Sequence, residues 1–267
     1  MLKRLSVLVV VALVAIATVA QEMAVSKSAY KKCVYVVGGD SLLYRELVPE
    51  NAGKKKFPLV VFMHGAGERG SDNELQLTHG AQMFLNPVNR IKYPAYVLFP
   101  QCPETEYWAY HPGIKKSSYP DSMPVVKEPS KLLVMVRGLV EKYIAEGKVD
   151  ADRVYVIGLS MGGMAVFDMA ERYSDMWAAA VPICGSINPN RIDKSRKVNF
   201  RIFHGDADAV VPVEGSRKAY LRLRELGANV DYVEFPGCTH GSWNPAFNLP
   251  DFMEWIFSPT CLLRLKG

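Results

Sequence analysis

At residues 154–164 the sequence reads Val-Tyr-Val-Ile-Gly-Leu-Ser-Met-Gly-Gly-Met. The apolar, β-branched start of this run predicts a buried strand, and Met-Ala-Val-Phe-Asp-Met-Ala at 164–170 predicts a helix. A sharp turn must join the two, and it would lift Ser160 out of the sheet with its hydroxyl exposed. Gly158 and Gly162 suit such a turn because it leaves no room for flanking side chains. The alternative is a glycine-rich strand–helix turn that buries the serine.

Strands and helices are predicted to alternate along the rest of the chain. Expected strands cover residues 33–37, 42–48, 57–63, 95–99, 154–159, 178–183, 199–203 and 230–235, the first two forming a hairpin. Expected helices cover residues 74–85, 130–145, 164–170, 214–226 and 250–257. Alternation of this kind predicts the α/β class, with a mostly parallel twisted sheet and helices on both faces. Residues 21–267 are predicted to form one domain.

Composition agrees with one globular domain. The chain has 267 residues, 49% of them hydrophobic, which is enough for a full α/β core. The formal net charge of +5 is scattered along the chain, so no nucleic-acid partner is expected. Five cysteines leave at least one unpaired, and their spacing fits no zinc pattern. No metal or organic cofactor is implied, and the sequence gives no indication of an oligomeric state.

The N-terminus has the pattern of a secretory signal peptide. Lys3-Arg4 precede an apolar run at 5–19, and Thr18-Val19-Ala20 supplies small residues before Gln21. We therefore expect a signal peptide at 1–20, export to the periplasm or outside the cell, and no stable membrane insertion after cleavage. An uncleaved anchor is the alternative, but the run is shorter than the roughly 20 residues that span a bilayer comfortably.

A serine hydroxyl becomes a strong nucleophile only when a base takes its proton and a carboxylate holds that base. When the serine sits in a strand–turn–helix elbow, the chain order is serine, acid, histidine. His64, His79 and His111 precede Ser160, and His204 ends a strand before any suitable acid turn. His240, in the loop after the last strand, is therefore the expected base.

Two aspartates compete for the role of the acid. Asp206 and Asp208 both follow the strand at 199–203. Asp208 is preferred because it leads into the turn that returns over the sheet toward His240. Asp206 is expected to cap its loop through backbone N–H groups, and Glu214 to occupy the first turn of a helix.

Developing negative charge on a substrate oxygen needs two backbone donors. The amide of Met161, directly after Ser160, is the first candidate. The second is the amide of Ala66, in the loop His-Gly-Ala-Gly-Glu-Arg-Gly at 64–70, whose glycines let the backbone approach a substrate. This loop is alternatively a plain strand–helix turn. Glu68 and Arg69 are expected only to brace the loop through an ion pair.

Together the sequences at 158–163, 64–70 and 204–212 resemble those of the α/β-hydrolase superfamily. Within it the chain is similar to exported serine esterases of the polyhydroxybutyrate-depolymerase-like, feruloyl and acetyl xylan esterase groups, and to predicted peptidases of prolyl-oligopeptidase type. The resemblance covers nearly all of residues 21–267. It implies a catalytic triad of Ser160, Asp208 and His240, and a small-molecule or polysaccharide-linked ester as substrate.

Aromatic residues are expected around this site. The resemblance implies that Trp243, close to His240, lines the acyl or sugar side. The segment 101–129 is rich in proline and aromatic residues, including Trp108, and is interpreted as a long loop at the mouth of the site. Trp108 is accordingly a second candidate for substrate contact. An ordinary insertion is the alternative.

Three functions follow from these patterns. An exported serine carboxylesterase, acting on feruloyl or acetyl esters of carbohydrates, is preferred. A serine peptidase of the same fold is second, although no glutamate pair for a peptide N-terminus is seen. A non-catalytic binding module is third, and it would require a damaged triad.

Overall fold

The computed structural model describes residues 28–53, 55–109 and 127–261. The expected signal peptide at 1–20 and residues 110–126 of the aromatic loop lie outside this part. Among the helices that the structure describes, none combines the length and the apolar character required to cross a bilayer.

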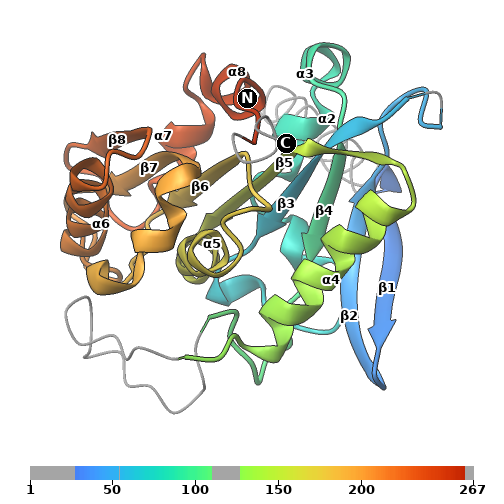
Figure 1. Cartoon of the computed structure of the whole chain (residues 1–267), viewed down its shortest axis with the longest axis horizontal. Helices are drawn as coiled ribbons and strands as arrows, with labels where there is room; N and C mark the ends of the chain where they lie inside the picture. Colours follow the sequence, from blue (N-terminus) through green and yellow to red (C-terminus); the bar gives the residue numbers. More distant parts are fainter. Residues whose placement is uncertain (1–27, 54, 110–126, 262–267) are drawn as a thin grey trace, which may run out of the picture.

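A single eight-stranded sheet forms the centre of the molecule, with β1 at one edge and β8 at the other (Figure 1). The strand order is β1-β2-β4-β3-β5-β6-β7-β8. Only the pairs β1–β2 and β2–β4 are antiparallel, so the sheet is mostly parallel as expected. The strands are β1 (Lys31–Val37), β2 (Asp40–Leu47), β3 (Phe57–Met63), β4 (Tyr96–Pro100), β5 (Val149–Leu159), β6 (Ala179–Ile183), β7 (Asn199–Gly205) and β8 (Val230–Phe235).

Helices cover both faces of the sheet. On one face α4 (Lys131–Ala145), α5 (Met161–Arg172) and α6 (Glu214–Glu225) contribute to the larger apolar cluster. On the other, α2 (Ala81–Leu85), α7 (Trp243–Phe247) and α8 (Phe252–Phe257) contribute to the second cluster. Strand β5 alternates between the two clusters, which is the period-2 pattern of a strand buried on both faces. The expected fold class, α/β with helices on both faces, is confirmed.

The expected helix over residues 74–85 is wrong in its extent. The structure has a short 3₁₀ turn, η2 (Leu75–Leu77), and then α2, with Gly80 between them at φ 78°. A Cβ at Gly80 would lie 2.4 Å from the ring of Phe62, so the chain turns here to pass a core aromatic. Tertiary packing therefore overrides the helical periodicity. The short helices α3 (Pro87–Lys92) and α7 were not predicted.

Parallel pairing brings distant loops to one edge of the sheet. Met63 at the end of β3 is in register with Gly158 near the end of β5. Gly205 at the end of β7 is likewise in register with Phe235 at the end of β8. A Cβ on Gly205 would lie 2.1 Å from the carbonyl oxygen of Cys238, so the loop after β8 rests directly on β7. The loops that carry the predicted site residues thus share the carboxyl edge.

Candidate active site

Ser160 occupies a strained turn between β5 and α5. Its backbone has φ 54° and ψ −118°, a conformation that non-glycine residues rarely adopt. A Cβ on Gly158 would lie 2.5 Å from the carbonyl oxygen of Gly162, and one on Gly162 would lie 2.0 Å from that of Met63. The neighbours are backbone atoms that cannot move aside. Glycine is therefore required at both positions, as the sequence indicated.

The structure brings the three predicted triad residues together. Nε2 of His240 lies 2.9 Å from Oγ of Ser160, and Nδ1 of His240 lies 2.8 Å from Oδ2 of Asp208. The Asp208 side chain is completely buried, whereas that of His240 is 22% exposed. With Nδ1–H donating to the carboxylate, Nε2 is left as the acceptor that faces the serine hydroxyl. A substrate can reach the partly exposed serine while the acid stays shielded.

Four donors surround the carboxylate of Asp208. Oδ1 accepts hydrogen bonds from the amides of Val210 (2.8 Å) and Val211 (2.9 Å). Oδ2 accepts from His240 and lies 3.2 Å from Nε2 of His204. Burial acts to raise the pKa of Asp208, but the hydrogen bonds from His204, His240 and the two amides outweigh it and hold the pKa well below its usual range. The carboxylate is therefore fixed in place and ionised.

Asp206 takes no part in this arrangement. Its Oδ1 accepts a hydrogen bond of 2.6 Å from the amide of Gly237, and the residue is exposed. It ties the loop after β7 to the loop after β8, which is the capping role expected from the sequence. Of the two competing aspartates, Asp208 is the one in contact with His240.

The two amides proposed for oxyanion binding each belong to the first residue of a helix beside Ser160. Met161 is the first residue of α5, and Ala66 is the first residue of η1 (Ala66–Glu68). Amides in the first turn of a helix have no partner within the helix. A Cβ on Gly65 would lie 3.6 Å from Cβ of Ser160, which places the loop directly next to the nucleophile. Both amides are thus positioned at the same end of the sheet.

His64 stabilises the loop at 64–70 through hydrogen bonds of both ring nitrogens. Its Nδ1 donates to the carbonyl oxygen of Gly65 (2.6 Å), and its Nε2 accepts from the amide of Cys102 (2.9 Å). Burial lowers the pKa of His64 to about 4. The ring is therefore neutral at physiological pH and fixed in one tautomer. The sequence placed His64 outside the triad but did not reveal this bracing role.

Trp108 does not line the site, contrary to the prediction. Its side chain is completely buried in the core, and Nε1 donates a hydrogen bond of 3.1 Å to the carbonyl oxygen of His64. The ring also packs edge-on against the His64 imidazole. No surface remains for a substrate, so the tryptophan supports the loop from inside. Its position near a polar loop in the sequence was misleading.

Trp243 lies where the sequence placed it, next to the base. Its ring centroid is 5.5 Å from that of His240 in an edge-on arrangement, and the residue is partly exposed.

The expected ion pair between Glu68 and Arg69 is not the contact that braces the loop at 64–70. Glu68 faces His79 instead, with 3.6 Å between Oε1 and Nε2. Arg69 stacks on Tyr107 and donates to the carbonyl oxygen of Ala66.

The five cysteines are all free thiols, and three of them are buried. One, Cys184, lies behind the triad: its Sγ, a carboxylate oxygen of Asp208 and a ring nitrogen of His240 are within 4.8 Å of one another. Burial raises the pKa of the Cys184 thiol well above its usual range. The Asp208 carboxylate already receives four donors, so this donor set fits a triad that is held by hydrogen bonds better than a metal centre.

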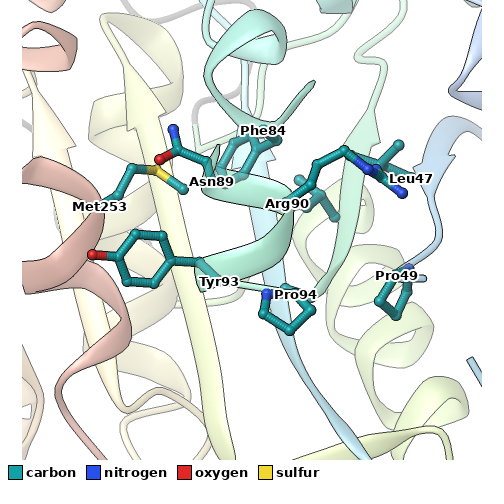
Figure 2. Close-up of a pocket in the computed structure, with 10 residues that line it drawn as sticks. Leu47, Pro49, Phe84, Asn89, Arg90, Tyr93, Pro94 and Met253 are labelled. Carbon is teal, nitrogen blue, oxygen red and sulfur yellow. The ribbon is translucent and has the colours of Figure 1, made fainter. Parts of the chain in front are cut away.

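A small pocket lies beside the end of β2 and the start of β4, where the parallel strands begin (Figure 2). It is bordered by residues of α3 and of the segment that leads into β4, such as Asn89, Tyr93 and Pro94, and by Met253 of α8. Its volume of about 10 Å³ holds about one water molecule. None of the predicted site residues borders it, and it has no room for a substrate.

Comparisons with known proteins agree with this geometry. A family model described as phospholipase/carboxylesterase matches residues 46–253. Carboxylesterase SOBER1 of Arabidopsis thaliana is 25% identical over 222 residues, which cover 78% of this chain and 91% of that protein. Putative esterase NocK of Nocardia uniformis subsp. tsuyamanensis is 26% identical over 174 residues, covering 64% of this chain and 45% of NocK.

Among solved structures, a thermostable esterase superposes with a TM-score of 0.81 at 32% identity over 88% of this chain. The chain spans 64% of that esterase and less than half of NocK. The family model alone covers well over half of the present sequence, including the elbow, the Asp208 turn and the His240 loop. The chain therefore belongs to the phospholipase/carboxylesterase family of α/β-hydrolases.

Proposed function

We propose that the chain is an exported serine carboxylesterase that hydrolyses carboxylic esters through an acyl-enzyme. The observation that carries this proposal is the unbroken set of contacts from Oγ of Ser160 through the His240 ring to the buried carboxylate of Asp208. Family membership and a relative named as a carboxylesterase support an ester rather than an amide as the substrate.

In the first half of the reaction, Oγ of Ser160 attacks the ester carbonyl while Nε2 of His240 takes its proton. The resulting imidazolium is stabilised by the ionised carboxylate of Asp208. The negative charge that develops on the carbonyl oxygen is met by the amides of Met161 and Ala66 and by the N-terminal end of α5. His240 then gives its proton to the leaving alcohol, and an acyl group stays on Ser160.

In the second half, a water molecule takes the place of the alcohol. His240 removes a proton from this water as it attacks the acyl carbonyl, and the same two amides hold the oxyanion. Collapse of the tetrahedral intermediate returns the proton to Oγ of Ser160 and releases the carboxylic acid. The proton transfers need only the triad, and the two amides serve the oxyanion.

The more specific substrate, a feruloyl or acetyl ester linked to carbohydrate, is supported by the sequence resemblance and by the aromatic ring of Trp243 beside His240. Export is supported by the basic and apolar pattern of residues 3–19. N-terminal sequencing of protein recovered from outside the cytoplasm tests export, and a first residue of Gln21 is expected.

A substrate panel tests the enzymatic proposal. It compares p-nitrophenyl acetate, methyl ferulate, acetylated xylan and a short peptide anilide, with Ser160→Ala as the control for background hydrolysis. Cleavage of the nitrophenyl ester by wild type but not by the variant supports the carboxylesterase. Faster cleavage of the anilide than of every ester would favour the peptidase. If methyl ferulate and acetylated xylan both stay intact, the carbohydrate-ester assignment is wrong.

A further inference from the structure

Three side chains extend the site from His240 toward the loop at 64–70. We call Glu68, His79 and Trp243 the Glu68 cluster. The Trp243 ring centroid lies 5.5 Å from that of His240 and 5.0 Å from that of His79. Nε2 of His79 lies 3.6 Å from Oε1 of Glu68. These contacts connect the base of the triad to the loop that carries Ala66.

Glu68 also lies close to the nucleophile. Its Oε2 is 3.0 Å from the point that a Cβ on Gly65 would occupy, and Cβ of Ser160 is 3.6 Å from the same point. The carboxylate and the serine therefore flank the same side of the Gly65 backbone. The cluster therefore borders the triad both at His240 and at Ser160.

Two polar atoms of the cluster are buried without a hydrogen-bond partner. One is Oε2 of Glu68, an acceptor, and the other is Nε1 of Trp243, a donor. Buried polar groups are nearly always paired in folded proteins, because leaving one unpaired is costly. An unpaired acceptor and an unpaired donor in a cluster that borders a triad are the features of a site that completes its hydrogen bonds with a ligand.

The position of Trp243 identifies the part of the substrate concerned. Nε2 of His240 delivers its proton to the leaving alcohol, so the alcohol must lie next to His240 in the productive complex. Among the residues that the structure describes, Trp243 is the aromatic residue in contact with that ring. The His79 side chain is 31% exposed, so the cluster extends from His240 to the solvent. A larger alcohol leaving the triad would pass along these three side chains.

We propose that the Glu68 cluster is a subsite for a polyhydroxy alcohol, so that the preferred substrates are esters of sugars. A sugar hydroxyl both donates and accepts, which matches Oε2 of Glu68 and Nε1 of Trp243, and the C–H face of a sugar ring packs on an aromatic ring. A quaternary ammonium alcohol would be attracted by the carboxylate and by the aromatic ring, but it has no donor for Oε2 of Glu68 and no acceptor for Nε1 of Trp243, so both atoms would stay unpaired. This inference rests on the proposed esterase function.

The test compares two acetates of similar size, a methyl xyloside monoacetate and cyclohexyl acetate, the second of which lacks hydroxyl groups. Glu68→Gln is expected to lower kcat/KM for the xyloside ester by about tenfold, because the sugar hydroxyl would then donate to a neutral amide oxygen instead of a charged carboxylate. The value for cyclohexyl acetate should change less than about twofold. Trp243→Phe keeps the ring, removes the donor, and should show the same selectivity.

Glu141→Gln, on the exposed face of α4, is the matched control and should leave both rates unchanged. An equal loss on both esters, no loss on either, or a wild-type preference for acetylcholine over the xyloside ester would overturn the subsite. So would wild type that cleaves p-nitrophenyl acetate but not the xyloside ester, and the esterase proposal would survive that result. Failure to cleave even p-nitrophenyl acetate would refute the esterase itself.

Discussion

His204 and His240 share one oxygen of the Asp208 carboxylate. Nδ1 of His240 lies 2.8 Å from Oδ2 and Nε2 of His204 lies 3.2 Å from the same atom. Nε2 of His204 also faces the carbonyl oxygen of Val211 at 2.9 Å, so its surroundings are acceptors and it must carry a hydrogen. The completely buried His204 ring therefore interacts with the same carboxylate oxygen that orients His240.

Replacing His204 should weaken the hold on the catalytic carboxylate. In His204→Asn the shorter side chain no longer reaches Oδ2, so Asp208 loses one of the four donors around it. A lost hydrogen bond to a charged group should lower kcat by about tenfold. Steady-state rates with p-nitrophenyl acetate check this, and an unchanged kcat would mean that His204 does not position the acid.

Asparagine substitutions at the two competing aspartates should have very different effects. Asp208→Asn keeps the shape but removes the charge and disturbs the tautomer of His240, so kcat should fall by about 10⁴-fold. The Asp206 carboxylate accepts a hydrogen bond from the Gly237 amide and lies outside the triad, so Asp206→Asn should change kcat by less than about threefold. Steady-state rates on one ester suffice. Comparable losses in the two variants would contradict the assignment.

Strain at Ser160 predicts a difference between two inactive variants. At φ 54° an alanine retains the unfavourable backbone, whereas a glycine adopts it freely. Ser160→Gly should therefore be more stable than Ser160→Ala by about 1 kcal/mol, partly offset by the greater entropy of the unfolded glycine chain. Urea unfolding of both proteins measures the difference. A glycine variant that is less stable than the alanine variant would show that the turn stores no strain.

Burial of neutral His64 predicts a loss of stability in mild acid. The pKa is lowered from 6.5 in the unfolded chain to about 4 in the folded protein. Unfolding therefore takes up a proton between these values, and the free energy of unfolding falls as the pH drops through this window. The His64 contribution between about pH 7.5 and about pH 5 is about 2 kcal/mol.

His64→Gln, which retains a donor and an acceptor, should remove that part of the pH dependence. Urea unfolding of wild type and variant at the two pH values gives the comparison. The contributions of the other histidines to the free energy of unfolding cancel in the difference between the two proteins. Equal pH dependence in the two proteins would contradict a neutral buried His64. An NMR titration of the His64 ring, showing no protonation down to about pH 5, provides an independent check.

Local patterns and chain order were sufficient to predict much of this molecule. The strand–turn–helix around Ser160 depends on neighbouring residues, and the order of serine, acid and histidine left His240 as the remaining base. Parallel strands then require the loops at 64–70, 206–213 and 236–242 to meet at one edge. The preference for Asp208 over Asp206 followed from the same topology.

Contacts between side chains that are distant along the chain could not be predicted from the sequence. Trp108 lies in a polar, proline-rich segment, and only the folded chain shows its ring beneath His64. The break at Gly80 depends on the Phe62 ring from another strand. Glu68 was paired with its neighbour Arg69 in the prediction, whereas the structure pairs it with His79. Each of these errors replaced a long-range contact with a local one.

The central claim is that Ser160 is a nucleophile activated by His240, and a fluorophosphonate probe tests it most directly. Mass spectrometry of the labelled and digested protein should find one phosphonate, on Ser160, and none at that position after the Ser160→Ala change. Folded wild-type protein that stays unlabelled, or that carries the label on another residue, would contradict the account.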